Sequence, residues 1–261
     1  MKNFFITATD TDAGKTFVSC ALIQALTQHN NTSKNKKLKV AAFKPISAGC
    51  DLVDGQLINE DAKLLSEFAN CAQSITHINP IAFEDPIAPH IAAKKLKQHI
   101  TVGEINNHYQ QVKLLNADIT LVEGAGGWRL PLGPVTIESS LTASIDNKIS
   151  TYQFLSDFVK GTDLDVILIV NMKLGCLNHA LLTYETIKAD GVKCIGWIAN
   201  CASSDAMNNL SENIAELEQL LPIPKIAQFD FIADIDDKGN NISFYEKINS
   251  ASKKINLSEL I

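Results

Sequence analysis

Residues 7–16 read TATDTDAGKT, and this stretch decides how the rest of the chain is interpreted. It ends in Ala13-Gly14-Lys15-Thr16 as a phosphate-binding loop does, but Thr9 stands where the strict pattern has a glycine. A strand is expected before it and a helix directly after it. In that setting backbone N–H groups and the helix N-terminus face a phosphate, Lys15 adds a positive charge and Thr16 offers a hydroxyl to Mg²⁺. An ordinary strand-to-helix turn is the alternative, so other segments have to decide.

Short apolar runs alternate with longer amphipathic ones, which is typical of β-α units around a parallel sheet. Several runs are apolar at successive positions, as strands covered on both faces are. We predict one α/β domain over residues 1–261, of the P-loop NTPase type, with a mostly parallel β-sheet flanked by helices on both faces. The expected strands are 4–8, 39–43, 119–122, 166–170, 194–200 and 225–229, and the expected helices are 15–28, 59–69, 104–116, 178–190 and 207–221.

Two regions are expected to be less regular. Residues 133–150 contain Gly133, Pro134 and many serine, threonine and asparagine residues, which indicates a flexible surface loop or lid. The tail after Asp236 is polar, and we expect it to be partly mobile.

Composition excludes several classes of protein. The chain has 261 residues, of which 46% are hydrophobic, and a formal net charge of -6. That charge argues against a broad nucleic-acid surface, and the basic run KNKKLK at 34–39 is interpreted as a solvated loop. The six cysteines have no metal-site spacing, the N-terminal stretch fits no signal peptide, and the longest aliphatic run, 166–170, is too short to cross a membrane. We therefore expect a cytoplasmic protein with reduced thiols, no nucleic-acid partner and no membrane partner.

Acidic side chains are expected near the phosphate loop. The stretch ITLVEGAGG at 119–127 predicts a buried strand with Glu123 at its carboxyl end, the edge where open α/β sheets bind ligands. A carboxylate there can hold Mg²⁺, although a capped strand end is the alternative. Asp61 lies early in a predicted helix, where acids are common for electrostatic reasons, so by itself it favours a structural role.

Two further segments carry candidate ligand groups. In AFKPISAG, residues 42–49, Lys44 follows a strand and is expected beside the phosphate loop, where two lysines would stabilise charge on a transferring phosphoryl group. A solvated surface lysine is the alternative. In MKLGCLNHALL, residues 172–182, backbone N–H groups at 175–178 can bind an anion such as a carboxylate, but Asn178 as a helix cap with a half-buried His179 explains the pattern equally well.

In this order, the segments resemble ATP-dependent dethiobiotin synthetases of the biotin pathway over most of the chain up to about residue 230. PIAPH at 86–90 and KLGCLNHA at 173–180 are far more specific to that family than a phosphate loop. The full set is TDTDAGKT (9–16), KPISAG (44–49), NPIAFEDPIAPHIAA (79–93), LVEGAGGW (121–128), KLGCLNHALLT (173–183) and GWIAN (196–200).

The resemblance implies an ATP-dependent cyclo-ligase that closes the cyclic urea of dethiobiotin from 7,8-diaminopelargonate, CO₂ or bicarbonate and ATP, with Mg²⁺. The route implied passes through a carbamate and a carbamic-phosphoric anhydride. Family members are homodimers with substrate sites near the subunit interface, so a homodimer is expected here.

The resemblance also implies roles for individual residues. Lys15 and Lys44 are the catalytic residues, and Thr16, Asp61 and Glu123 hold Mg²⁺. The ATP-binding residues are Asp12, Ala13, Gly14, Lys15, Thr16, Phe17, Asp61, Glu123, Gly124, Ala125, Gly126, Asn200 and Phe229, with Asn200 reading the adenine. The substrate-binding residues are Lys44, Ser47, Ala48, Leu174, Gly175, Cys176 and Asn178.

Four positions depart from the family pattern. Ala8 replaces a customary loop glycine, which indicates that the backbone there does not need a positive φ. Ala48 stands where some members have a serine or threonine, and Ser47 lies next to it. Asn213 is the best match to a tyrosine at the partner subunit, and Asp230 falls where proline is frequent. The insertion at 139–150 has no assigned role.

Two other classes share parts of the pattern. A ParA- or MinD-like switch ATPase has the same architecture but carries a signature lysine early in the loop, where this chain has Asp10. An amidoligase of the cobyrinate or CTP synthetase type normally has a glutaminase domain, for which the chain has no room. ATP hydrolysis that requires diaminopelargonate and bicarbonate would indicate a synthetase, whereas stimulation by DNA, lipid or a partner protein would indicate a switch.

Overall fold

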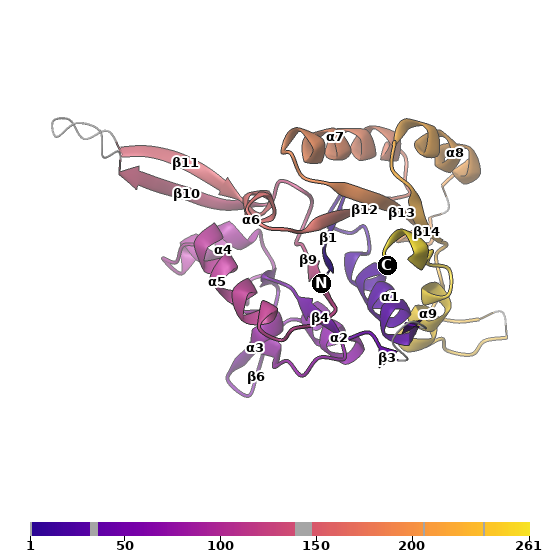
Figure 1. The fold of residues 1–261 in the computed structure, drawn as a ribbon, viewed down its shortest axis with the longest axis horizontal. Helices are drawn as coiled ribbons and strands as arrows, with labels where there is room; N and C mark the ends of the chain where they lie inside the picture. The colour runs from indigo at the N-terminus through magenta and orange to yellow at the C-terminus, as the bar shows by residue number, and fades with distance from the viewer. Residues whose placement is uncertain (1, 32–35, 139–147, 206, 237) are drawn as a thin grey trace.

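A six-stranded parallel sheet forms the centre of the computed structural model, which describes residues 2–31, 36–138, 148–205, 207–236 and 238–261 (Figure 1). All six predicted strands and all five predicted helices are present. In sheet order the strands are β14 (Lys225–Phe229), β13 (Cys194–Asn200), β12 (Asp165–Asn171), β1 (Lys2–Ala8), β9 (Ile119–Glu123) and β4 (Val40–Phe43). Every pairing in this sheet is parallel, so the carboxyl ends of the strands share one edge.

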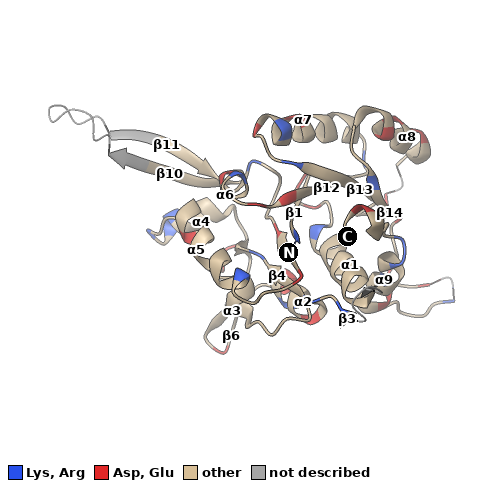
Figure 2. Ribbon diagram, viewed as in Figure 1, with Lys and Arg blue, Asp and Glu red and all other residues tan. Residues whose placement is uncertain are grey.

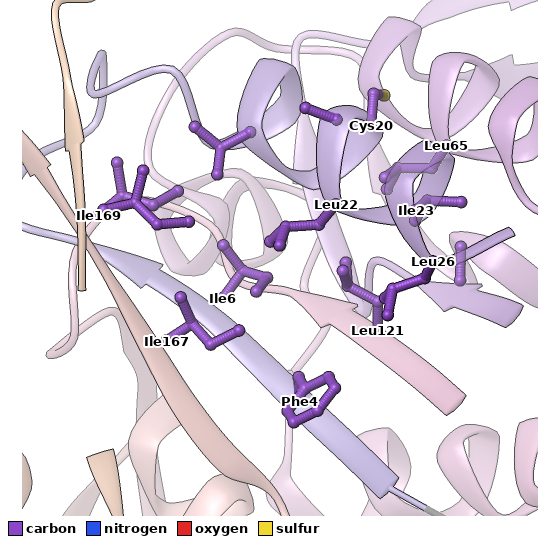
Figure 3. Packing of buried hydrophobic residues seen from close by; sticks show 14 of the residues in the cluster. Phe4, Ile6, Cys20, Leu22, Ile23, Leu26, Leu65, Leu121, Ile167 and Ile169 are labelled. Atoms are coloured by element: carbon purple, nitrogen blue, oxygen red, sulfur yellow. The ribbon is translucent and has the colours of Figure 1, made fainter. Parts of the chain in front are cut away.

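One face of the sheet is covered by three helices, α1 (Lys15–Gln28), α2 (Glu60–Phe68) and α9 (Phe244–Ser252). Helix α1 lies directly over β1 and β9, and Figure 3 shows its Leu22 and Leu26 packed toward Ile6 and Leu121. These side chains are fully buried, so each contributes roughly 1.5–3 kcal/mol of hydrophobic stabilisation. This packing fixes the start of α1, and with it the phosphate loop, against the sheet.

The opposite face is covered by two groups of helices. Residues of alternate parity, such as Phe5 and Val122, pack with α4 (Pro89–Lys95), α5 (Val102–Lys113) and α6 (Leu155–Lys160). Leu168 and Trp197 pack with α7 (Cys176–Ala189) and α8 (Leu210–Leu220). The strands are thus buried on both faces, which explains their uninterrupted apolar sequences.

Several short strands and one short helix lie outside the main sheet. The pair β5 (Ile46–Ala48) and β8 (Ile81–Phe83) is parallel, whereas β6 (Asp51–Val53) with β7 (Gln56–Ile58) and β2 (Asn30–Asn31) with β3 (Lys36–Lys37) are antiparallel. The helix α3 (Ile75–Ile78) leads into β8. Of the basic run 34–39, residues 36 and 37 form β3, residues 38 and 39 are irregular, and residues 34 and 35 lie outside the described residues.

The prediction of a loop at 133–150 was wrong for the described part of that segment. Strands β10 (Pro131–Glu138) and β11 (Lys148–Phe154) form an antiparallel hairpin that extends away from the main sheet (Figure 1). Val135, Ile137 and Ile149 are β-branched, and this favours strand in spite of the neighbouring polar residues. Residues 139–147 of the predicted insertion lie outside the described residues.

The described part of the polar tail after Asp236 contains a helix that was not predicted. Helix α9 begins at a capping box, in which Ser243 accepts from the Glu246 N–H and Glu246 accepts from the Ser243 N–H. Its Ile248 and Ala251 are buried against α1, and Leu260 after the 3₁₀ turn Leu257–Glu259 is buried too. The apolar positions recur at helical spacing among polar neighbours, so the polar composition hid an amphipathic helix.

Charged residues of both signs are interspersed along the elements (Figure 2). Among the described residues, every helix is too short or too polar to cross a membrane.

Candidate active site

The loops that follow β1, β4 and β9 meet at the carboxyl edge of the sheet and surround a cavity of about 700 Å³. This is the edge at which open α/β sheets bind ligands. The predicted site residues that line the cavity are Asp12, Gly14, Lys15, Thr16, Phe17, Lys44, Ser47, Ala48, Asp61, Glu123, Ala125 and Gly126. These predicted residues therefore lie together around one cavity.

The phosphate loop is held in shape by its own backbone and by β13. Gly14 precedes α1 with φ 76°, a left-handed conformation that favours glycine. A Cβ atom at Gly14 would lie 2.4 Å from Asn200 Nδ2, and that amide donates to the Ala13 carbonyl at 2.8 Å. No residue other than glycine fits this position without a shift of the loop or of Asn200. Ala8 does not have a positive φ, so that prediction is confirmed.

Lys15 is buried under the loop that it follows. Its Nζ donates to the carbonyls of Asp10 at 3.3 Å and Thr11 at 3.0 Å. Burial lowers the pKa of Lys15 to about 8, and nearby Glu123 only partly opposes that shift. The ammonium is thus held among neutral carbonyl groups at the cavity wall, where an anionic group would stabilise its charge.

Lys44 lies at the centre of a charge cluster rather than on the surface. Its Nζ is 2.6 Å from Glu123 Oε1 and 2.8 Å from Asp61 Oδ2, and Lys44 is only 4% exposed. Burial alone would lower the pKa of Lys44, but the two carboxylates outweigh it and raise that pKa above its usual value. Lys44 in turn outweighs the burial of Asp61 and lowers the pKa of that carboxyl. The cluster therefore places the Lys44 ammonium between the carboxyl groups of Asp61 and Glu123.

The oxygen atoms around Lys44 suit a divalent cation. Thr16 Oγ1 donates to Glu123 Oε1 at 3.1 Å, which brings the hydroxyl and both carboxylates together. Glu123 is fully buried, and its Oε2 has no hydrogen-bond partner among the described residues. Mg²⁺ prefers such hard oxygen ligands and usually takes only one or two carboxylates from a protein, the others coming from water and phosphate. The described residues hold no cluster of three His, Cys, Asp or Glu side chains, so Thr16, Asp61 and Glu123 fit Mg²⁺ only in this partial manner.

Ser47 and Ala48 lie on β5 at the cavity wall. The Ser47 hydroxyl is buried and donates to Asn79 Oδ1 at 2.6 Å, and Asn79 Nδ2 donates to the Lys44 carbonyl at 2.8 Å. Asn79, two residues before β8, thus connects Ser47 on β5 to the backbone of Lys44. The Ser47 hydroxyl is therefore already hydrogen-bonded, and the neighbouring Ala48 has only a methyl side chain at the cavity wall.

Several predicted site residues do not line the cavity. Ala13, Gly124 and Asn200 lie directly behind its wall, and Phe229 is buried beneath Phe17 with ring centroids 5.8 Å apart. The remaining four predicted substrate residues, Leu174, Gly175, Cys176 and Asn178, lie at the start of α7 and also do not line the cavity.

The start of α7 differs from the alternative in which Asn178 caps the helix and His179 is half-buried. Gly175, with φ 93°, is the residue at the helix N-cap, and Cys176 is buried in the core. Leu174 is 94% exposed, and both Asn178 and His179 are exposed. Asn178 is therefore not the cap, and His179 is not half-buried.

Sequence reasoning missed about half of the cavity wall. The PIAPH stretch was recognised for its specificity but no residue in it was given a role, although Pro86 to Pro89 form one wall. Lys173 was missed as well, and its Nζ pairs with Asp10 at 2.6 Å and lowers the pKa of that carboxyl. The other unpredicted lining residues are Thr11, Ile46, Asn59, Leu130 and Ala202.

Two of the unusual positions have structural roles at the surface. Asp230, after β14, pairs with Lys254 Nζ at 3.1 Å. Asn213, in the first turn of α8, donates to the Asn209 carbonyl at 2.8 Å. Neither contact involves the cavity.

Comparison with known proteins identifies close relatives. A family model described as an AAA domain matches residues 2–149 and 133–238. An ATP-dependent dethiobiotin synthetase BioD of Alteromonas mediterranea is 42% identical over 252 residues, which are 95% of this chain and 100% of the relative. The protein of the same name from Pseudoalteromonas translucida is 43% identical over 87% of this chain and 89% of its own. A ParA family ATPase from Chlorobium tepidum has a similar fold, with a TM-score of 0.50 at 14% identity over 99% of this chain and 92% of that chain.

Proposed function

Because the chain belongs to the ATP-dependent dethiobiotin synthetase family, we propose that it closes the ureido ring of dethiobiotin from 7,8-diaminopelargonate, CO₂ and ATP. It is an ATP-dependent ligase. The observation that supports this reaction most directly is the convergence of Lys15 and Lys44 on one cavity with Thr16, Asp61 and Glu123. The likeness to a ParA family ATPase concerns the fold alone, and Asp10, which pairs with Lys173, stands where such switches have their signature lysine.

The reaction needs two bond-forming steps after the carbamate forms. One amine of the substrate adds to CO₂, and a carbamate oxygen attacks the γ-phosphorus of ATP, so that ADP leaves and a carbamic-phosphoric anhydride remains. The second amine then attacks the carbamoyl carbon, phosphate leaves, and the five-membered ring closes. The attack of the carbamate on ATP brings two anions together, so the protein contributes mainly positioning and charge stabilisation.

Lys15 and Lys44 are assigned different parts of that task. Lys15, under the phosphate loop, binds the outer phosphates, because its pKa near 8 leaves it mostly protonated at neutral pH. Lys44, which its two carboxylates hold protonated, contacts the carbamate and the migrating phosphoryl group. Ser47 and Ala48 form the neighbouring wall for the diamine. The remaining loop residues, from Asp12 to Phe17 and from Gly124 to Gly126, together with Asn200 and Phe229, surround or support the nucleotide.

Thr16, Asp61 and Glu123 are proposed as the Mg²⁺ ligands. When bound, this ion would neutralise phosphate charge. The support is the buried Glu123 Oε2, which lacks a hydrogen-bond partner among the described residues.

A homodimer and a cytoplasmic location complete the proposal. The segment 174–178 is assigned to the substrate carboxylate, yet in one chain it does not line the cavity. If a second copy of the chain brings this segment to the cavity of the first, the segment can contact the substrate there. The exposed Leu174 and Leu182 of the same region offer apolar surface for contact with that copy. All six cysteines are free, as in a reducing compartment.

The test is direct synthesis. Protein, MgATP, ¹⁴C-bicarbonate and diaminopelargonate are incubated together, and labelled dethiobiotin is separated from the mixture. We expect label in the product, ATP consumption only when both other substrates are present, and no stimulation of ATP hydrolysis by DNA or lipid vesicles. If the rate of ATP hydrolysis does not depend on the diamine but increases with DNA or lipid vesicles, the proposal is contradicted.

A further inference from the structure

Asp190 lies at the C-terminal end of α7, outside the cavity, and holds two residues of a cavity loop. Its Oδ2 accepts from Trp128 Nε1 at 2.8 Å, and its Oδ1 accepts from Arg129 Nη2 at 2.9 Å. The Asp190 side chain is 8% exposed and the Trp128 ring is buried, whereas the Arg129 side chain is 42% exposed. The contact with Trp128 is therefore the better shielded from water. Charge-assisted hydrogen bonds of this kind are about twice as strong as neutral ones.

The loop that Asp190 holds runs from residue 124 to 130 and continues from Glu123. Ala125, Gly126 and Leu130 line the cavity, so the loop is part of its wall. Three of its seven residues are glycine, and such a loop loses much conformational entropy when it is ordered. The structure must therefore restrain it by contacts made elsewhere.

Those contacts converge on Trp128 and Arg129. The Trp128 ring is buried and packs edge-on against Phe5 at 6.1 Å, while Arg129 Nη1 donates to the buried Ser156 Oγ at 3.0 Å. Asp190 is the residue that contacts both of them at once. Lys160 Nζ lies farther from the carboxylate, at 3.9 Å, and pairs more closely with Asp157.

We propose that Asp190 is a positioning residue of the active site: by binding Trp128 and Arg129 together, it orders the 124–130 loop in the conformation that receives the nucleotide. The inference rests on the proposed function only in naming ATP as the ligand of this wall. Without Asp190 the loop has to be ordered when ATP binds, and that entropy cost lowers the affinity.

The experiment measures ATP affinity by calorimetry with MgATP alone, so it does not depend on whether dethiobiotin is formed. For Asp190→Ala we expect the Kd for ATP to rise about tenfold, because the entropy cost of ordering the loop then reduces the free energy of ATP binding. For Asp190→Asn, which can still accept from Trp128 but loses its charge toward Arg129, we expect a rise of about threefold. Lys160→Ala is the matched control and should leave the Kd unchanged.

Tryptophan accessibility supplies a second measurement. The chain has two tryptophans, and both Trp128 and Trp197 are buried. In Asp190→Ala we expect acrylamide to quench one of them more readily, and the additional substitution Trp128→Phe should abolish that gain. If Asp190→Ala does not fold, Asp190→Asn carries the same test. A folded variant with wild-type Kd and wild-type quenching would overturn the proposal.

Discussion

Lys44 and Glu123 show how strongly one residue can depend on another in this site. Glu123 is fully buried and Lys44 is 4% exposed, so each supplies the charge that makes burial of the other tolerable. Loss of one partner from such a pair leaves an uncompensated buried charge. Lys44 therefore has a structural role in addition to the catalytic one proposed for it.

Lys44→Met should lower the free energy of unfolding by about 3 kcal/mol or more, because Glu123 then stays buried without a counterion. Lys44→Met/Glu123→Gln should recover much of that loss, since the charge is removed with its partner. Neither variant should synthesise dethiobiotin. Urea unfolding followed by circular dichroism measures the stabilities, and a double variant as unstable as the single one would argue against the pair.

Cys194 predicts a pH dependence of stability. Burial raises its pKa from 9.0 to about 12, so the folded state keeps the proton that the unfolded chain releases. The stabilisation is complete below pH 9 and is lost as the pH rises above 9. Between pH 9 and pH 10 this one thiol should cost about 1 kcal/mol of unfolding free energy.

Cys194→Val isolates that contribution, because other buried acids such as Cys20 and Tyr109 have raised pKa values too. In urea unfolding at pH 8, 9 and 10, the decline in unfolding free energy from pH 8 to pH 10 should be smaller by about 1.4 kcal/mol in the variant than in the parent. Equal declines would mean that Cys194 ionises normally in the folded protein.

At the scale of the element, close packing of β13 against β14 depends on Gly196. A Cβ atom there would lie 2.6 Å from Ile226 Cδ1 and 2.9 Å from the Pro224 carbonyl oxygen. Gly103, in the first turn of α5, offers the opposite environment, because its Cβ would meet only Thr101 Oγ1 at 3.9 Å. Substitution by alanine is therefore expected to have opposite effects on stability at these two positions.

Gly196→Ala should destabilise the protein by about 1–3 kcal/mol, because the strands have to separate to admit the methyl group. Gly103→Ala should be neutral or stabilising by up to about 1 kcal/mol, since alanine loses less backbone entropy in a helix. Thermal unfolding of both variants checks the pair. An unchanged melting temperature for Gly196→Ala would show that Ile226 can move aside.

At the scale of the whole molecule, the residues proposed to bind the substrate lie in two separate regions of the chain's structure. Lys44 and Ser47 line the cavity, whereas the segment 174–178 begins α7 and does not. The homodimer that we propose, with sites completed across its interface, would account for both positions. One polypeptide has a mass of 28.4 kDa, so light scattering should give about twice that value.

Subunit complementation tests the shared site more sharply. We expect Lys44→Ala and Gly175→Trp homodimers to be inactive separately. Mixed under conditions that exchange subunits, they should recover about a quarter of wild-type activity, because half of the dimers are hybrids with one intact site of two. Continued inactivity in confirmed hybrid dimers would place both residues in the site of a single chain.

At this scale we interpret the chain as a single domain. The central sheet takes strands from residue 2 to residue 229, and α9 returns to pack on α1.

The amino-acid sequence by itself determined the six parallel strands, five of the helices, the phosphate loop and the family. These features have local causes: apolar periods, a glycine before a helix, and motifs of contiguous residues. It did not determine the short helices α3, α4 and α6, the hairpin β10–β11 or α9, whose apolar positions are few and mixed with polar ones. Such weak local preferences are decided by the surfaces on which the elements pack.

Only the tertiary structure decided which charges meet. Lys44, Asp61 and Glu123 come from three separate segments. Local pattern favoured a structural role for Asp61 and left a surface position open for Lys44. Asp190 contacts Trp128 across 62 positions of the chain, and no local pattern indicates such a contact. The environment of a titratable side chain depends on neighbours that the fold brings from distant segments, and so do its burial and its pKa.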